Sequence, residues 1–297
     1  MISARELTKR YGDVHAVDGM SFDVTPGAVT GFLGANGAGK STTMRLIMGL
    51  DAPSSGSATI GGRAYRDLHA PAREVGALLD PRCMHPGRTA RSHLRWMADA
   101  AGIARSRVEE VLGLVGVADA ADRRLGTFSL GMRQRVGIAG ALLGDPAVLL
   151  LDEPLNGLDP EGIRWVRELL KGLAVQGRTV FVSSHLMNEM EQAADRVVVI
   201  GRGKLIDSLD VAELRLRAAA VRVAPADAAA APRLHEVLRE AGATFDKNTD
   251  ALGLSAERIG RLALEHGIAL RELAVRASGL EESFLQLTAG EREEQPA

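Results

Sequence analysis

Residues 34–42 read Gly-Ala-Asn-Gly-Ala-Gly-Lys-Ser-Thr and lie between an apolar run, Val29–Leu33, and a segment with a helical pattern. In this position the motif is typical of a phosphate-binding loop. Its glycines let successive backbone N–H groups turn toward an anion. The helix that follows directs the positive end of its dipole to the same place. A chance glycine-rich turn is the alternative, but strand, loop and helix together predict a site for a nucleoside triphosphate.

The residues of the loop have separate expected roles. Lys40 supplies a positive charge to the β- and γ-phosphates, and the hydroxyl of Ser41 is placed to bind Mg²⁺. The predicted nucleotide-binding residues are Gly34, Ala35, Asn36, Gly37, Ala38, Gly39, Lys40, Ser41 and Thr42. A nucleoside triphosphate with Mg²⁺ as its cofactor is the ligand that this set predicts.

Composition narrows the class of protein. The 297 residues are 46% hydrophobic and 25% charged, which fits one large or two unequal globular domains. A formal net charge of −2 gives no electrostatic basis for binding nucleic acid. The single cysteine, Cys83, excludes an internal disulfide. With no signal-peptide core and no apolar run near the ~18–20 residues that span a bilayer, we expect a cytoplasmic protein.

Short apolar runs alternate with longer helical patterns up to residue 207. The expected strands are Val148–Leu151, Thr179–Val182 and Val197–Ile200, each apolar throughout as in strands buried on both faces. The expected helices are 89–101, 106–115, 131–143, 161–176 and 187–194. This alternation predicts an α/β domain over residues 1–207, with a largely parallel sheet covered by helices on both faces. Residues 84–143 form an expected helical subdomain.

Composition changes after residue 207, where an alanine-rich stretch is broken by Pro225 and Pro232. Beyond it we expect strands near 221–223, 252–254 and 270–275, and helices near 233–241 and 257–266. This order fits a small split-βαβ module. It predicts an α+β accessory or regulatory domain over residues 208–290, followed by a disordered polar tail, 291–297.

A second chemical motif follows the strand Val148–Leu151, where the chain reads Asp152-Glu153-Pro154. The carboxyl ends of parallel strands form the edge at which open α/β sheets bind ligands. We expect Asp152 to hold Mg²⁺, directly or through water, and Glu153 to act as the general base on the attacking water. An ordinary strand with an acidic turn is the alternative.

Residues 128–135 read Phe-Ser-Leu-Gly-Met-Arg-Gln-Arg. Together with the Asp-Glu-Pro motif, they resemble the signature sequence of ATP-binding-cassette (ABC) proteins, with Leu130 and Met132 in place of the more common residues. Ser129 and Gly131 keep the hydroxyl and backbone donors that can hold a γ-phosphate. In the family that phosphate belongs to the opposite subunit. The resemblance therefore implies ATP as the nucleotide and a head-to-tail dimer in which Ser129, Leu130, Gly131 and Met132 act on the partner's ATP.

Further positions agree with the resemblance. Tyr11 matches the aromatic residue that stacks on adenine, Asp159 matches a loop that joins the two subunits, and His185 matches the histidine that senses the γ-phosphate. Glu153 and His185 are therefore the implied catalytic pair. Asp80 stands where the family usually has a glutamine, and we expect it to keep a link to Mg²⁺ although its side chain is shorter and charged.

Two further segments bear on possible partners, and the first of them has two interpretations. A basic stretch follows Asp80 and comprises Arg82, His85, Arg88, Arg91, His93 and Arg95. It is either a solvated helix face or the surface that meets a membrane partner, since the family docks its permease beside this loop. The segment Gly279–Thr288 resembles the ending common in exporter ATPases of the ABC-2 type.

The resemblance, close over residues 1–206, implies the ATP-hydrolysing subunit of an ABC exporter. Such a subunit dimerises with a second copy and works on a separate ABC-2-type permease at the inner face of the cell membrane. A soluble ABC ATPase of the ribosome or DNA is an alternative, but the chain has one phosphate loop and no sustained heptads. A regulator without turnover is another, but Glu153 is present. No nucleic acid partner is expected, and the cargo is not indicated by any residue.

Overall fold

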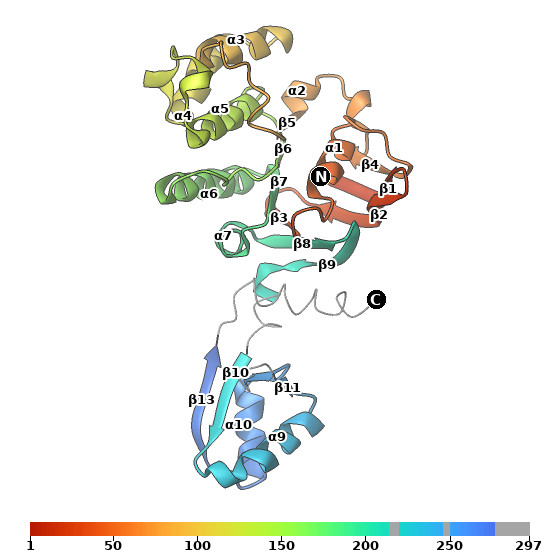
Figure 1. Ribbon diagram of the computed structural model, residues 1–297, viewed down its shortest axis with the longest axis vertical. Helices are drawn as coiled ribbons and strands as arrows, with labels where there is room; N and C mark the ends of the chain where they lie inside the picture. The colour runs from red at the N-terminus through yellow and green to blue at the C-terminus, as the bar shows by residue number, and fades with distance from the viewer. Residues whose placement is uncertain (214–219, 246–249, 277–297) are drawn as a thin grey trace. The chain divides into compact units, whose positions relative to one another are not determined.

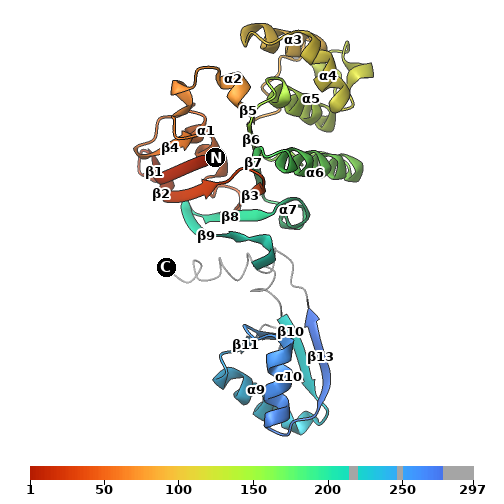
Figure 2. The same ribbon diagram turned by 180° about the vertical axis from the view of Figure 1, so that it is seen from behind.

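The computed structural model describes residues 1–213, 220–245 and 250–276. The chain divides into two compact units, Met1–Leu209 and Asp210–Ala297. Figures 1 and 2 show the first unit from opposite sides, with its strands stacked at the centre and helices around them. Each unit buries an apolar core of its own.

A six-stranded sheet forms the centre of the first unit, in the order β5-β6-β7-β3-β8-β9. Its strands are β5 (Val75–Leu78), β6 (Val148–Leu151), β7 (Thr179–Ser184), β3 (Val29–Leu33), β8 (Arg196–Gly201) and β9 (Lys204–Asp210). Neighbouring strands from β5 to β8 run parallel. Because β3, β6 and β7 are buried along their whole length, the prediction of a largely parallel sheet with apolar strands is confirmed.

The helices of the first unit are α1 (Lys40–Ile47), α2 (Pro71–Glu74), α3 (Ala90–Ala100), α4 (Ser106–Leu114), α5 (Leu130–Leu142), α6 (Pro160–Val175) and α7 (Met187–Ala193). Five of them, α3 to α7, begin within one residue of their predicted positions, and the one-turn helix α2 is an addition to the prediction. Thr89, Ser129 and Asp159 cap α3, α5 and α6, each accepting a hydrogen bond from a backbone N–H in the first turn. α3, α4 and α5 contact one another and form a helical block (Figure 1).

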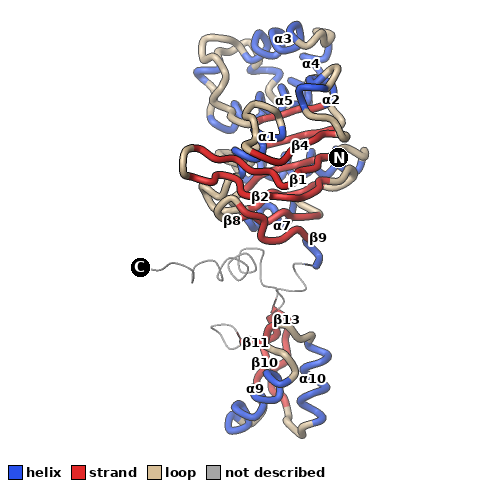
Figure 3. Tube along the Cα trace, turned by 90° about the vertical axis from the view of Figure 1, so that its right-hand side faces the viewer, coloured by secondary structure: helices blue, strands red, loops and turns tan. Residues whose placement is uncertain are grey.

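One face of the six-stranded sheet differs from the prediction of helices on both faces. α6 and α7 cover one face (Figure 1), but a second sheet and α1 cover the other, which faces the viewer in Figure 3. This antiparallel sheet, in the order β2-β1-β4, consists of β1 (Ile2–Tyr11), β2 (Val14–Val24) and β4 (Ser55–Ile60). Phe22 of β2, Phe32 of β3 and Phe181 of β7 meet between the sheets, with ring centroids 5.0–5.8 Å apart.

An irregularity in β1 explains why its pattern is not visible in the sequence. Glu6 has a φ of 46°, and the pairing of β1 with β2 shifts register between Ala4 and Leu7. Such a bulge adds a residue to one strand, so the buried side chains of Ile2, Ala4 and Leu7 do not follow a strict period of two.

The second unit contains a four-stranded antiparallel sheet in the order β11-β12-β10-β13. Its elements are β10 (Ala220–Pro225), α9 (Ala231–Glu240), β11 (Thr244–Phe245), β12 (Ala251–Leu252), α10 (Ala256–Glu265) and β13 (Leu270–Arg276). Because β12 lies between β10 and β11, the split-βαβ order is present, with the two-residue strand β11 as an addition to the prediction. The segment Gly279–Thr288 and the tail 291–297 lie outside the described residues.

Two smaller features complete the fold. One-turn 3₁₀ helices lie at Tyr65–Asp67, Ala118–Ala120, Leu125–Thr127 and Ala228–Ala230. In the part of the chain that the structure describes, no helix is both long enough and apolar enough to cross a bilayer.

Candidate nucleotide site

The phosphate loop connects the central strand β3 to α1, and two of its glycines are required by close backbone contacts. A Cβ atom at Gly39, whose φ is 107°, would come 2.5 Å from the carbonyl oxygen of Ala16. A Cβ atom at Gly34 would come 2.7 Å from the carbonyl oxygen of Ile200. Any other residue at either position would displace the loop from the strands that support it. The loop is therefore held in one shape by its neighbours.

Lys40 is the first residue of α1, and its ammonium group lies inside the loop. Its Nζ donates hydrogen bonds to the carbonyl oxygens of Gly34 and Ala35, at 2.7 and 3.3 Å. The side chain is only 7% exposed. A buried ammonium beside the N-terminus of a helix gives the loop a concentrated positive field for an anion.

Asp152 and Glu153 follow β6, and Ser183 of the neighbouring strand β7 orients both. The Ser183 hydroxyl donates to Oδ1 of Asp152 and accepts a hydrogen bond from the backbone N–H of Glu153, at 2.9 Å. Asp152 is 6% exposed, so its carboxylate is held in place away from bulk water. The sequence did not indicate Ser183, because a serine within a buried strand has no local motif.

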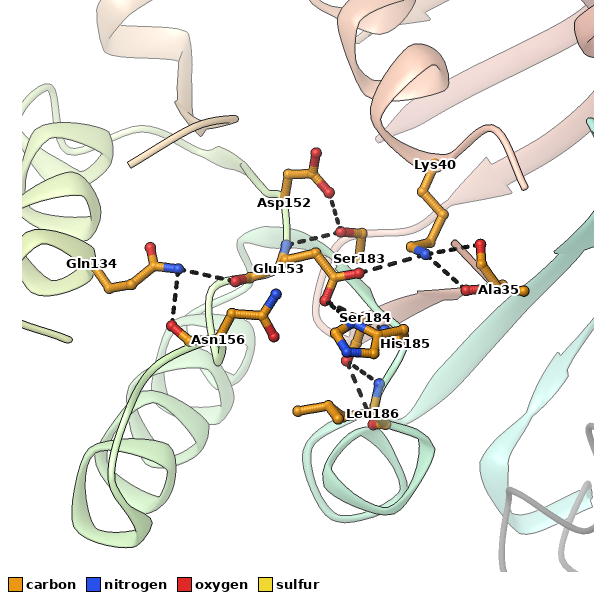
Figure 4. A network of polar contacts seen from close by, with 11 residues as sticks. Ala35, Lys40, Gln134, Asp152, Glu153, Asn156, Ser183, Ser184, His185 and Leu186 are labelled. Carbon is orange, nitrogen blue, oxygen red and sulfur yellow. Dashed lines mark hydrogen bonds and ion pairs between the residues drawn. The ribbon is translucent and has the colours of Figure 1, made fainter. Parts of the chain in front are cut away.

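Glu153 links the two halves of the site. Its Oε1 lies 3.5 Å from Nζ of Lys40, and its Oε2 lies 2.9 Å from Nδ1 of His185, which follows β7 (Figure 4). Its backbone has a φ of 49°, in the left-handed region that residues other than glycine rarely adopt. Strain of this kind gathers at functional sites. The structure thus brings Lys40, Glu153 and His185, predicted from three separate motifs, into direct contact.

The signature residues and Asp159 lie at helix starts. Ser129 caps α5 by accepting a hydrogen bond from the backbone N–H of Met132, at 3.2 Å, and Gly131 is the second residue of that helix. Leu130 is 46% exposed. Asp159 caps α6 through a 2.9 Å bond from the N–H of Gly162, so its side chain has a structural role within this chain.

The carboxylate of Asp80 forms an ion pair with Arg82, two residues further along the chain. Its Oδ1 accepts from the backbone N–H and Nε of Arg82, at 2.8 and 3.0 Å, and its Oδ2 accepts from Nη2 at 3.2 Å. These hydrogen bonds hold the pKa of the Asp80 carboxyl below its usual value. Asp80, Ser41 and Asp152 all line one cavity of about 880 Å³.

The three predicted magnesium ligands are oxygen donors, as Mg²⁺ prefers. In residues 1–213, 220–245 and 250–276, no three His, Cys, Asp or Glu side chains gather to form a metal site by themselves. A magnesium ion at Ser41 and Asp152 would therefore take its remaining ligands from water and from phosphate oxygens, which is its usual mode of binding with nucleotides.

Tyr11 ends β1 and is half-exposed. Its hydroxyl donates to Oδ2 of Asp51 at 3.2 Å, and Nζ of Lys9 lies 4.9 Å from its ring centroid. The ring is therefore held at the surface by polar contacts at its edge and over its plane.

The chain is similar to known families over both units. Residues 17–156 match a family model described as "ABC transporter", and residues 217–281 match one described as a domain of unknown function, DUF8746. The bacitracin transport ATP-binding protein BcrA of Bacillus licheniformis is 41% identical over 220 residues, covering 73% of this chain and 72% of that protein. The uncharacterized ABC transporter ATP-binding protein YhcH of Bacillus subtilis is 35% identical over 304 residues, covering 99% and 98%.

A third relative extends the similarity to another cargo. The Nod factor export ATP-binding protein I of Burkholderia orbicola is 33% identical over 314 residues, covering 99% of this chain and 98% of that protein. Among solved structures, an ATP-binding subunit of an ABC transporter matches with a TM-score of 0.66 at 27% identity, over 72% of this chain and 92% of that one. A dimeric cassette in a post-hydrolysis state with ADP and Pi matches with a TM-score of 0.65 at 25% identity, over 71% and 99%.

Proposed function

The chain belongs to the ATP-binding subunits of ABC transporters, and from that premise we propose that it hydrolyses Mg·ATP to drive a separate exporter permease. The observation that carries the proposal is the convergence of Lys40, Glu153 and His185, with Glu153 3.5 Å from the lysine and 2.9 Å from the histidine. A cation for phosphate, a carboxylate for water and an imidazole beside it are the groups that ATP hydrolysis needs.

Catalysis at this site is mainly positioning and charge neutralisation. Lys40 and the N–H groups of the loop hold the β- and γ-phosphates in line with an attacking water. Glu153 takes a proton from that water at Oε1 or Oε2. His185 holds the Glu153 carboxylate in orientation and reaches toward the γ-phosphate. Bound Mg²⁺ would neutralise charge on the β- and γ-phosphate oxygens.

The predicted magnesium ligands differ in how many of their oxygen atoms already accept hydrogen bonds from other side chains. Ser41 and Asp152 are the residues that would hold the ion, because Ser183 occupies only one carboxylate oxygen of Asp152. Asp80 uses both of its oxygens on Arg82. We place Asp80 in the metal's outer environment, where it would act through water.

A second copy of the chain completes each site. Leu130, which is exposed, and Ser129, which caps α5, lie at the start of that helix, where they would face the γ-phosphate of a nucleotide bound by the partner. Dimeric assembly in two solved cassette structures, at 25% and 26% identity, supports this arrangement. One phosphate loop and one signature per chain then give two composite sites.

The surface beside Asp80 is the proposed docking site of the permease, which would hold the protein at the inner face of the cell membrane. Trp96 is 54% exposed, lines the cavity with Met84 and Met97, and lies under the guanidinium of Arg88 at 4.8 Å. Much of the basic stretch instead pairs within the chain: Arg82 with Asp80, Arg91 with Glu109 and Asp122, and Arg95 with Glu109. An aromatic and apolar surface therefore supports docking better than a free basic face.

The experiment is purification of the tagged full-length chain from detergent-solubilised membranes, with mass spectrometry of its companions and an ATPase assay of the product. A stoichiometric polytopic membrane protein together with Mg²⁺-dependent hydrolysis is the expected result. Recovery with ribosomes or DNA-associated proteins would favour the soluble ABC ATPase, the alternative function. Relatives named for transport of bacitracin and export of Nod factor support an exporter.

A further inference from the structure

A buried glutamine of α5 reaches the backbone that carries the proposed base. Gln134 is 2% exposed. Its Nε2 donates to the carbonyl oxygen of Glu153 at 3.1 Å and to that of Asn156 at 3.4 Å (Figure 4). Both acceptors belong to the loop that follows β6, while Gln134 belongs to the helix that begins with the signature. The amide thus joins the helical block to the catalytic loop within one chain.

The backbone at Glu153 is one that needs such support. Its left-handed φ of 49° persists only where surrounding contacts impose it. Ser183 holds the N–H of Glu153 from β7, and Gln134 holds its C=O from α5. The residue is therefore fixed on both sides, and these contacts set where its carboxylate points.

A second contact joins the same two segments. Gly157, with a φ of 74°, lies directly against the side chain of Leu130, so that an added Cβ atom would overlap it. Gly131 likewise lies close to the carbonyl oxygen of Gly157. The first turns of α5 thus contact the catalytic loop at Glu153 and at Gly157, and helix and loop form one packed unit.

We propose that Gln134 is a positioning residue for hydrolysis: it fixes the backbone of Glu153 and couples the place of the signature helix to the orientation of the base. This inference rests on the proposed ATPase function. Gln134 touches no reacting atom and acts through Glu153. Any displacement of α5 when the opposite subunit engages its signature would then change the catalytic geometry in the same chain.

The hydrogen bonds of the amide argue against a general role in folding. Within the described residues, Oε1 of Gln134 is buried without a hydrogen-bond partner. A buried polar group with an unused acceptor adds little to stability. The Nε2 group, in contrast, is used on the catalytic loop alone. Gln134→Met, which keeps the length and removes both polar atoms, is therefore the informative substitution.

The test is steady-state hydrolysis by the full-length protein. Gln134→Met should lower kcat about 10- to 100-fold, because displacements near 1 Å are costly in catalysis, and leave KM and the affinity for a fluorescent ATP analogue within about twofold. Ile138→Val, in the buried face of the same helix, is the matched control and should leave kcat unchanged. Gln134→Glu keeps the shape but replaces the donor nitrogen, and it should reproduce the loss if Gln134→Met does not fold.

A double-mutant cycle with Glu153→Gln decides how Gln134 acts. If it acts through Glu153, Gln134→Met adds no further loss in single-turnover hydrolysis by the Glu153→Gln protein. An equal fold-loss in both backgrounds, or wild-type kcat in the single variant, would overturn the inference. Absence of hydrolysis by the wild-type protein would instead contradict the proposed function, so the two failures are distinct.

Discussion

The carboxyl edge of the six-stranded sheet and the C-terminal unit differ in how many polar side chains they bury. At the edge, Lys40, Gln134, Asp152 and Ser183 are all buried. Three of them, Lys40, Gln134 and Ser183, contact the strained residue Glu153 directly. In the described residues of the C-terminal unit, Asp250 is the buried charged residue, and it pairs with Arg222 at 2.9 Å.

This difference indicates that the sheet edge serves catalysis, while the C-terminal unit is held together by apolar packing. Burying charge is unfavourable unless it is paired and hydrogen-bonded, so a dense polar cluster is retained for its chemistry. The C-terminal unit buries apolar faces of α9 and α10 against its sheet. Changes at the edge should therefore alter turnover, while changes in the C-terminal unit should alter stability alone.

The largest effect is expected from Glu153→Gln. Loss of the general base should lower kcat about 10²- to 10⁴-fold and leave ATP binding intact, so that an ATP-bound dimer accumulates. Hydrolysis of labelled ATP and size-exclusion chromatography with ATP measure the two effects. Glu161→Gln, in the exposed first turn of α6, is the control. Wild-type turnover in Glu153→Gln would remove the base assignment.

Ser129→Ala sharpens the comparison, because Ser255 makes the same kind of cap in the C-terminal unit. Each hydroxyl accepts a hydrogen bond from a backbone N–H at 3.2 Å. Ser129→Ala and the matched substitution Ser255→Ala should each lower the stability of the capped helix by about 1 kcal/mol. Only Ser129→Ala should lower kcat, by about tenfold. The affinity of the monomer for ATP, measured by fluorescence titration, should stay the same. A large loss of that affinity would contradict action on the opposite subunit.

Asp80→Ala tests whether the arginine-paired carboxylate assists the metal. The Mg²⁺ concentration for half-maximal hydrolysis should rise about threefold, as expected for a water-mediated contact. Arg82→Ala should lower that concentration, because it frees Oδ2 of Asp80 and leaves only the backbone hydrogen bond on Oδ1. If neither variant changes Mg²⁺ dependence or turnover, Asp80 has no link to the metal.

The smallest effect on turnover is expected from Arg222→Ala, which weakens the support of a buried carboxylate. The free energy of unfolding of the C-terminal unit should fall by about 1–3 kcal/mol, seen as faster hydrogen exchange in β10. Turnover should stay within about twofold of wild type. Arg261→Ala, at an exposed pair with Glu257, should change neither. A tenfold loss of kcat in Arg222→Ala would show that the two regions are coupled.

Sequence motifs predicted the parts of the site whose residues are consecutive in the chain. The phosphate loop and the acidic pair follow apolar strands, and parallel pairing places such strand ends together. The contacts of Ser183 and Gln134 were not predictable, because their partners include backbone atoms whose position depends on tertiary structure. The pairing of Asp80 with Arg82 likewise depends on the turn between them. The bulge at Glu6 and the two-residue strand β11 leave too little periodicity for a prediction.

Three of the chain's six phenylalanines, Phe22, Phe32 and Phe181, meet behind the catalytic edge. Phe32 belongs to the strand that leads into the phosphate loop, and Phe181 to the strand that ends before His185. Packed aromatic rings are nearly incompressible at the density of a protein interior. They act as a spacer between β2 and the paired strands β3 and β7, so the thickness of these rings sets the separation of the two sheets, while β3 and β7 are held together by their own hydrogen bonds. A homologue with smaller residues at the three positions would need its two sheets to lie closer together behind the phosphate loop.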